Sequence, residues 1–475
     1  MEGLKPYIRM ILILLITATL LIRLCYNPIS QLRPDLKLRV TIRDGQITMF
    51  AIYTGGSPEL SLGNYSDLLA KIDGIGFSRK NVTELSFVDL ENTSTLLLLG
   101  QKEFSEEDIQ TIARYIMLCG GSILYLVPTE ITDSVKDFLR LFGLEVLGNV
   151  YDDASYYKSE ETVVLNGTWD NRSKIFLDVQ TIVVANASAL NLTNSLELLA
   201  MFNLTKTMNV TENKSVPLVY ASPLIWGGNN TTAEYKGRYL YGTNVTLGIT
   251  LKFWSGSRVL ILSSPHILSD NYVRLPQYDN EEFMEQVLLW LAKKLEQIEI
   301  DVIDYSPQSG IVYLDKDQFI NACFNVTMKD VPYDIYQKQD LISNYYNLSL
   351  LAGLEHLGRL VHIVEPEIVN STYDNITNTF KYVVNVTINI RELYNRSVVI
   401  FLRLVVFNDY YGFFWSKALR FEIVKHKVTF VEFHPVIIIT VGMIATSIVL
   451  GLVLYPYARK YKSRIREFER KITKK

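Results

Sequence analysis

The longest apolar run lies close to the C-terminus and predicts a membrane-spanning helix. Val436–Leu454 holds nineteen residues without a charge, and about 20 apolar residues span a bilayer as a helix. Prolines at positions 435 and 456 border the run, and a basic tail follows it. A short Lys/Arg-rich tail beside a span stays in the cytoplasm. We therefore expect a transmembrane helix at 435–456 and a cytoplasmic tail at 457–475.

A shorter apolar run, Met10–Ile22, lies near the N-terminus between Arg9 and Arg23. Its length is typical of the apolar core of a signal peptide and is short for a span. No clear small-residue cleavage site follows it, so residues 1–26 are either a cleaved signal peptide or a retained signal anchor. Both alternatives place the large middle segment outside the cytoplasm.

The first half of that segment alternates strands with helices. Leu96–Leu99 is a continuous apolar run that predicts a strand covered on both faces. Ser105 then predicts a helix N-cap, and glycines 120 and 121 end the helix before a strand at Ser122–Val127. A second unit pairs the strand Arg258–Leu262 with an amphipathic helix over Asp279–Leu295. Strand–helix–strand units predict an α/β domain with a parallel sheet at 27–297.

Short strands prevail in two other stretches. Residues 151–250 read as a strand-rich insertion in the α/β domain, and residues 298–434 predict a membrane-proximal β-sandwich of antiparallel strands. Within the second stretch, Val383–Ile390 alternates apolar residues with Asn and Thr. Such alternation predicts a strand with one face in the core and one in solvent.

The distribution of charge along the chain supports the predicted membrane topology. The formal net charge of the chain is −3, which argues against a dedicated nucleic-acid binder. This total hides an uneven distribution, because residues 459–475 carry +7 and residues 1–26 carry +2, which leaves −12 for residues 27–458. Two basic ends therefore flank an acidic middle.

Nineteen Asn-x-Ser/Thr sequons lie in the acidic middle and none at the ends. This distribution predicts an extracytoplasmic, N-glycosylated domain. The adjacent residues Asn229 and Asn230 are not expected to carry glycans together, because two bulky chains would collide. The candidate sites are Asn64, Asn81, Asn92, Asn166, Asn171, Asn186, Asn191, Asn203, Asn209, Asn213, Asn229, Asn230, Asn244, Asn325, Asn347, Asn370, Asn375, Asn385 and Asn395.

Motifs for catalysis are missing from the sequence. There is no GxSxG, Walker A or GxGxxG motif, and the three cysteines and five histidines form no metal-binding pattern. We therefore predict no catalytic residue, no metal site and no cofactor. Cys119 ends a predicted helix and is followed by a strand, which is the reverse of the order around a catalytic nucleophile. We therefore interpret it as a small apolar residue that closes the helix. The stretch most typical of a ligand loop follows the strand Arg258–Leu262, where parallel sheets bind ligands; its candidate residues are Ser263, Ser264, His266 and Asp270.

Four strings along the chain have a recognisable order. The first is LLLLG with FSEEDIQTIARYIMLCGGSILYLVP, and the second is RVLILSSPHILSDNYV with NEEFMEQVLLWLAKK. The third comprises Tyr336, Asp340, Leu341 and Tyr345, and the fourth joins Gly412-Phe413 to FEIVKHKVTFVEFHP. In this order they resemble one family, the 48-kilodalton non-catalytic subunit of oligosaccharyltransferase. The basic tail is longer and the sequons are denser than in that family, and the N-terminal run lacks the expected cleavage site.

The resemblance implies a glutamine-amidotransferase-like α/β domain without catalytic residues, a β-sandwich and one C-terminal span. It implies a non-catalytic accessory subunit that binds membrane lipid, the catalytic oligosaccharyltransferase subunit and other membrane subunits, and that supports N-glycosylation outside the cytoplasm. The low Cys and His content favours an archaeal homologue. Two alternatives stay open: a membrane-anchored extracellular glycan- or envelope-binding protein, and an enzyme that uses Cys119 or the Ser263–Asp270 loop.

Overall fold

The computed structural model describes residues 48–424, 454–457 and 459–466. Within the first range, the gaps are 172, 194, 206, 212–213, 296–297, 315–316, 330–348, 357–358, 365, 391–397 and 409–411. Residues 40–425 form one compact unit, and the two chain ends form another. In the second unit, residues 454–457 and 459–466 are helical.

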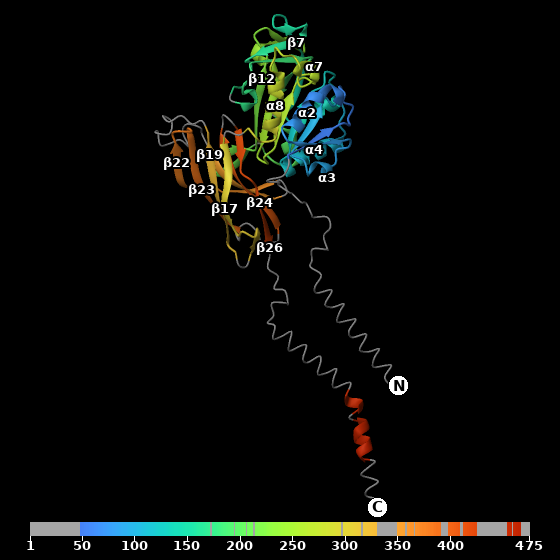
Figure 1. Ribbon diagram of the computed structural model, residues 1–475, viewed down its shortest axis with the longest axis vertical. Helices are drawn as coiled ribbons and strands as arrows, with labels where there is room; N and C mark the ends of the chain where they lie inside the picture. Colours follow the sequence, from blue (N-terminus) through green and yellow to red (C-terminus); the bar gives the residue numbers. More distant parts are fainter. Residues whose placement is uncertain are drawn as a thin grey trace, which may run out of the picture. The chain divides into compact units, whose positions relative to one another are not determined.

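An eleven-stranded mixed sheet forms the centre of the first part of the chain (Figure 1). Five neighbouring strands run parallel in the order β2-β1-β3-β4-β16, and the others join antiparallel beyond β16. The strands are β1 (Met49–Tyr53), β2 (Ser78–Val82), β3 (Thr95–Leu99), β4 (Ser122–Leu126), β5 (Leu144–Asp152), β9 (Ser188–Leu192), β12 (Val219–Trp226), β13 (Thr231–Tyr235), β14 (Arg238–Tyr241), β15 (Thr246–Phe253) and β16 (Arg258–Leu262).

Helices cover both faces of the parallel part of the sheet, which explains its continuous apolar strands. One core cluster joins alternate strand residues to α2, α7 and α8, and a second joins the other residues to α3, α4 and α5. The helices are α2 (Ser66–Gly74), α3 (Phe87–Leu90), α4 (Glu106–Cys119), α5 (Asp133–Leu141), α6 (Glu197–Met201), α7 (Asp270–Val273) and α8 (Asn280–Leu291), with short 3-10 turns η4 (Leu62–Tyr65), η5 (Lys174–Phe176) and η6 (Gly242–Asn244).

Helix α4 forms where the sequence predicts it. The Ser105 side chain accepts a hydrogen bond from the backbone N–H of Asp108, and the Asp108 carboxylate accepts one from the backbone N–H of Ser105. This reciprocal pair satisfies two N–H groups that a helix start leaves open. Gly120 ends the helix at φ 63°, a conformation that suits glycine.

The expectation of a parallel-sheet, amidotransferase-like fold is wrong. Strands outnumber helices and lie in mixed and antiparallel sheets, because the strands of residues 144–253 continue the central sheet antiparallel. The connection from β15 to β16 shows the physical reason. Only four residues separate Phe253 from Arg258, whereas a parallel connection needs a crossover of a dozen or more residues.

Two further sheets occupy residues 298–424 and are compatible with the predicted sandwich. A four-stranded sheet has the order β17-β19-β23-β22, and a six-stranded sheet has the order β18-β26-β24-β20-β21 with β25 on β24. One core cluster draws on both sheets. The strands are β17 (Ile298–Ser306), β18 (Ile311–Tyr313), β19 (Phe319–Met328), β20 (Ser349–His356), β21 (Arg359–Val364), β22 (Glu367–Asp374), β23 (Thr379–Asn389), β24 (Val398–Asn408), β25 (Gly412–Trp415) and β26 (Leu419–Val424).

Strand β23 confirms the alternation predicted at residues 383–390. Val384, Val386 and Ile388 are buried, whereas Asn385 and Thr387 are exposed. The sequon at Asn385 therefore lies on the solvent face of its sheet.

Small sheets complete the part of the chain at residues 156–217. Strands β6 (Tyr156–Tyr157), β7 (Ser159–Asn166) and β8 (Thr181–Ala185) form one of them, and β10 (Thr207–Thr211) pairs with β11 (Lys214–Pro217) in the other. Short strands therefore lie within residues 151–250, the stretch that the sequence reads as a strand-rich insertion.

Among the residues that the structure describes, no helix is long and apolar enough to cross a membrane. Most of the span predicted at 435–456 lies outside the described residues, as do the N-terminal segment 1–26 and the resemblance positions Tyr336, Asp340, Leu341 and Tyr345.

Candidate functional site

The carboxyl ends of β1 and β3 are the place where an open sheet of this kind would hold a ligand. The chain leaves β1 for β2 on one side and returns as β3 on the other, so the strand order reverses between β1 and β3. Ligands of doubly wound sheets bind in the crevice at such a reversal.

In this chain, the loops that follow the two strands bind each other across that crevice. The backbone N–H of Glu59 donates to the carbonyl of Gly100 at 2.8 Å. The carbonyl of Gly56 accepts from the N–H groups of Lys102 and Glu103 at 3.1 and 3.0 Å. Backbone of the chain itself therefore fills the place of a ligand.

Two further features tighten this closure. The buried Gln101 donates from Nε2 to the carbonyl of Tyr53 at 2.7 Å, which ties the second loop to the end of β1. Gly56 has a φ of 65°, and a Cβ there would lie 2.4 Å from the Glu103 carbonyl oxygen. Only glycine allows the two loops to approach so closely.

The predicted ligand loop after β16 is largely buried, and several of its polar groups bind other parts of the chain. Ser263 and Ser264 are 1% and 0% exposed. The Ser264 hydroxyl donates to the carbonyl of Ala185 and accepts from the backbone N–H of His266. The Pro265 carbonyl accepts from the Tyr65 hydroxyl at 2.7 Å. The loop thus joins β16 to β8 and to the turn before α2.

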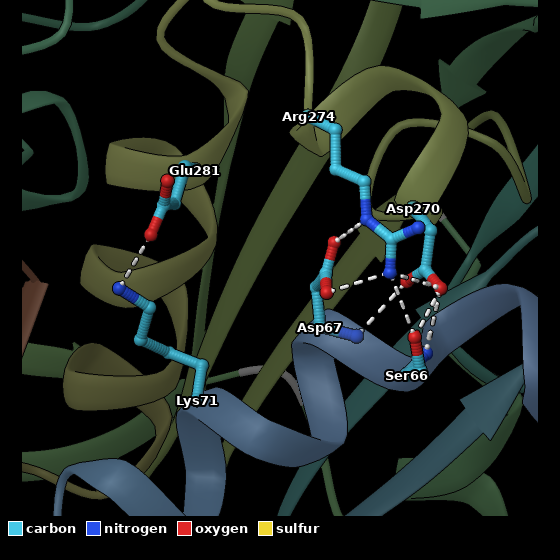
Figure 2. Close-up of polar contacts among 6 residues, drawn as sticks. All are labelled: Ser66, Asp67, Lys71, Asp270, Arg274 and Glu281. Atoms are coloured by element: carbon cyan, nitrogen blue, oxygen red, sulfur yellow. Dashed lines mark hydrogen bonds and ion pairs between the residues drawn. The ribbon is translucent and has the colours of Figure 1, made fainter.

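Asp270, the last residue of that loop, acts as a cap for a helix that is distant in sequence. Its carboxylate accepts from the backbone N–H groups of Ser66 and Asp67 at 3.1 and 2.9 Å, and also from the Ser66 hydroxyl (Figure 2). These groups open α2, which has no side-chain cap of its own. A carboxylate at a helix start satisfies free N–H groups and favours the helix dipole.

Arg274 extends this contact on the surface. Its guanidinium donates to both carboxylate oxygens of Asp67, at 2.6 and 2.9 Å, and to Asp270 at 3.2 Å (Figure 2). The hydrogen bond from Arg274 is the main cause that lowers the pKa of Asp67. Sequence reasoning missed Arg274, although its position four residues after Asp270 on one helical face is a readable signal.

A groove of about 510 Å³ lies beside this cluster, between α2 and α8. Lys71 lines it and donates to Glu281 at 2.9 Å and to Glu285 at 3.1 Å. Asp67 and Arg274, which also line it, bind each other. The charged side chains that line the groove are therefore paired with one another.

His266 is half-buried, and its environment gives a pH-dependent stability. Burial lowers the pKa of its imidazole, and Glu59 partly offsets this effect. The unfolded chain therefore binds more protons than the folded chain near its ordinary pKa of about 6.5. Stability should be unaffected by this group above that pH and should fall as the pH is lowered toward the folded-state pKa.

We expect wild type to lose more stability than His266→Gln between pH 7.5 and 5.5. Urea unfolding at a series of pH values measures the difference, and the other titrating groups cancel between the two proteins. A difference in unfolding free energy that stays constant with pH would contradict this assignment.

The cysteines offer no activated nucleophile in the described structure. Burial raises the pKa of the Cys119 thiol to about 12, and Glu91 adds to the increase. Burial also raises the pKa of Cys323. The thiolate is the reactive form of cysteine, so Cys119 stays protonated at neutral pH. Among the residues described, no group of three or more His, Cys, Asp or Glu is arranged to hold a metal ion.

The sequon asparagines lie at the surface wherever their side chains are described. Eleven are exposed, four are half-buried and none of these fifteen is buried. The side chains of Asn209, Asn213, Asn347 and Asn395 lie outside the described residues. The exposed set is Asn81, Asn166, Asn171, Asn191, Asn203, Asn229, Asn230, Asn244, Asn370, Asn375 and Asn385, and the half-buried set is Asn64, Asn92, Asn186 and Asn325.

Comparison with known proteins assigns no family. No family model matches the chain, and no curated protein matches it. Among solved structures, the mmIFT52 N-terminal domain matches 51% of this chain and 97% of its own length, at 16% identity and a TM-score of 0.40. AggA, the major subunit of aggregative adherence fimbriae type I from Escherichia coli, matches 28% of this chain and 97% of its own length, at 12% identity and a TM-score of 0.15. Both scores are too low to carry an argument.

Proposed function

We propose that this chain is a membrane-anchored, non-catalytic accessory subunit of an oligosaccharyltransferase complex, with its large domain outside the cytoplasm and its C-terminus in the cytoplasm. In this role it binds the catalytic subunit and other membrane subunits, which carry out the transfer of glycan to protein. The chain itself supplies a folded surface and uses no cofactor.

The observation that carries the proposal is the closure of the strand ends. The crevice between β1 and β3, where an enzyme with such a sheet would hold its substrate, is filled by backbone hydrogen bonds such as those of Gly56 and Glu59. The loop residue Asp270 caps α2. Both features support a domain that acts through its outer surface.

The distribution of sequons supports the location. Residues 27–458 hold all nineteen sequons and a charge of −12 between two basic ends. None of the sequon asparagines with a described side chain is buried, so folding leaves each of them accessible to a glycosylating enzyme. The apolar run at 436–454 and the basic tail supply the anchor.

Purification of the tagged full chain in a mild detergent tests the proposal. We expect a multispanning glycosyltransferase to co-purify in a defined ratio, and deletion of the chain to reduce N-glycosylation of other surface proteins. Retention of normal glycosylation in the deletion strain, or purification of the chain alone, would contradict the role. Binding of a soluble glycan by the isolated chain, without any membrane partner, would favour the glycan-binding alternative.

A further inference from the structure

The two edges of the central sheet are protected in different ways. An edge strand presents unpaired backbone groups that can pair with another chain, and charged side chains deter such pairing. At one edge, β2 carries Arg79 and Lys80. At the other edge, β14 begins with the single exposed charge of Arg238 and then exposes Tyr239 and Tyr241, whose exposed fractions are 59% and 58%.

These two residues form a continuous aromatic surface, which we call the tyrosine ledge. They are two residues apart on a strand and therefore share one face. Their ring centroids are 6.3 Å apart, with an angle of 40° between the rings. Contiguous exposed apolar surface is one feature of places that another group covers.

A sequon lies directly beyond the tyrosine ledge. After Tyr241 the chain turns sharply, with Gly242 at a φ of 57°, and the single turn η6 places Asn244 three residues away. The N–H of Val245 donates to the carbonyl of Gly242 at 2.9 Å and closes this turn. Asn244 is exposed, so a glycan on its side-chain amide starts within a few residues of the rings.

We propose that Asn244 is glycosylated and that the first sugars of its glycan pack on the tyrosine ledge, where they cover the β14 edge of the sheet. The apolar face of a sugar ring packs on an aromatic ring, while its hydroxyl groups stay in solvent. The glycan thus adds, at β14, to the protection that the charge of Arg238 gives at one end of this short strand.

The neighbouring sequons provide an internal contrast. A Cβ at Gly242 would lie 3.9 Å from the Cα of Asn229, so the loop with Asn229 and Asn230 lies against the η6 turn. The occupant that we assign is the glycan of Asn244, because its chain segment continues directly from Tyr241. A glycan on either of the other two asparagines is an alternative that the test separates.

The inference rests on the proposed location, and the first measurement keeps the two apart. Mass spectrometry of the full chain from its native membrane gives the occupancy of each sequon. Occupancy at Asn244 is expected. If other sequons are occupied and Asn244 is bare, only the present inference is overturned. If none of the nineteen is occupied, the extracytoplasmic location is overturned as well.

Thermal unfolding of the glycosylated full chain then tests the packing. We expect N244Q to lower the melting temperature by about 2–4 °C, as for the loss of one aromatic packing contact in a domain of this size. N81Q removes an exposed sequon on the opposite edge and is the matched control, with no change expected. An N244Q protein that melts like the N81Q protein overturns the inference, as does a loss that only N229Q/N230Q reproduces.

A double-mutant cycle identifies the tyrosine ledge as the contact. Y239S/Y241S should lower the melting temperature of the glycosylated protein to a similar extent, and N244Q added to it should cause no further loss. If the melting-temperature losses of N244Q and Y239S/Y241S add in the combined variant, the glycan does not pack on the tyrosine ledge. Nitration of surface tyrosines provides a readout on the native fold: Tyr239 and Tyr241 should react several-fold faster in N244Q than in wild type. Equal nitration rates in the two proteins overturn the proposal.

Discussion

Replacing Arg258 with alanine should lower the free energy of unfolding by about 3–5 kcal/mol, one of the two largest effects expected in this chain. Arg258 is 0% exposed, and its guanidinium donates to the carbonyl of Trp290 at 2.7 Å. Its Cζ lies 5.1 Å from the centroid of the Trp290 ring and 5.6 Å from that of Trp415. The substitution removes a large buried side chain, a charge-assisted hydrogen bond and two contacts with aromatic faces.

The location of Arg258 explains the size of this effect. It begins β16, the Trp290 carbonyl lies in the last turn of α8, and Trp415 ends β25. A cation near a helix C-terminus also interacts favourably with the helix dipole. Burial lowers the pKa of Arg258 to about 9, so the side chain remains charged at neutral pH. One cation thus links the central sheet, its covering helix and a strand of the six-stranded sheet.

Urea unfolding of the full chain measures the loss, and Arg420→Ala is the matched control. Arg420 also lies on a strand, but its side chain is 55% exposed and pairs with Glu422 on the surface. Exposed pairs of this kind contribute about 0–1 kcal/mol. Equal effects of the two substitutions would show that the burial and stacking of Arg258 do not stabilise the fold.

Local signals in the sequence predicted the helices and strands of the parallel region well. The Ser105 cap, the apolar stripe and the glycine at position 120 fix α4 because each acts within one or two turns of the chain. The apolar runs at β3 and β16 likewise gave strands at the expected residues. These features depend on neighbours in sequence, so a single sequence contains them.

The pattern of apolar residues along the chain could not predict whether neighbouring strands run parallel or antiparallel. A strand reads the same in a parallel or an antiparallel sheet when both of its faces are buried, as they are for β16. The informative signal was the length of the connection from Phe253 to Arg258, which contains Gly256 at a φ of 89°. A tight turn of this kind joins antiparallel strands, and the sequence interpretation gave more weight to the two strand–helix units.

The candidate ligand loop at Ser263–Asp270 shows a second limit of prediction from sequence. A polar loop after a parallel strand predicts a ligand site by its position, but the partner of each polar group decides its role. The partners of Asp270 are the backbone groups of Ser66 and Asp67, about two hundred residues earlier in the chain. Nothing within the local sequence indicates that pairing. The same holds for Arg258, whose charge at the start of a strand would ordinarily be expected at the surface.

Asp270→Ala should lower the free energy of unfolding by about 2–4 kcal/mol, because it removes both a helix cap and charge-assisted hydrogen bonds. Asp270 is 7% exposed, and its carboxylate accepts from the first N–H groups of α2. Without it, these N–H groups and the Arg274 guanidinium lose a shared acceptor. Asp270→Asn should cost less, because the amide oxygen can still accept one hydrogen bond while the charge is lost.

Asp73→Ala provides the control on the same helix, since Asp73 lies at the other end of α2, is 52% exposed and pairs with Arg79. Its effect should stay below about 1 kcal/mol. Hydrogen exchange should also show faster exchange at the start of α2 in Asp270→Ala than in Asp73→Ala, because the loss of a cap frays the helix from that end. If Asp270→Ala is as stable as wild type, the Asp270 carboxylate does not stabilise α2 by capping it. Its position at the end of the β16 loop would then favour a ligand as its partner, and the closed, non-catalytic interpretation of these strand ends would have to be given up.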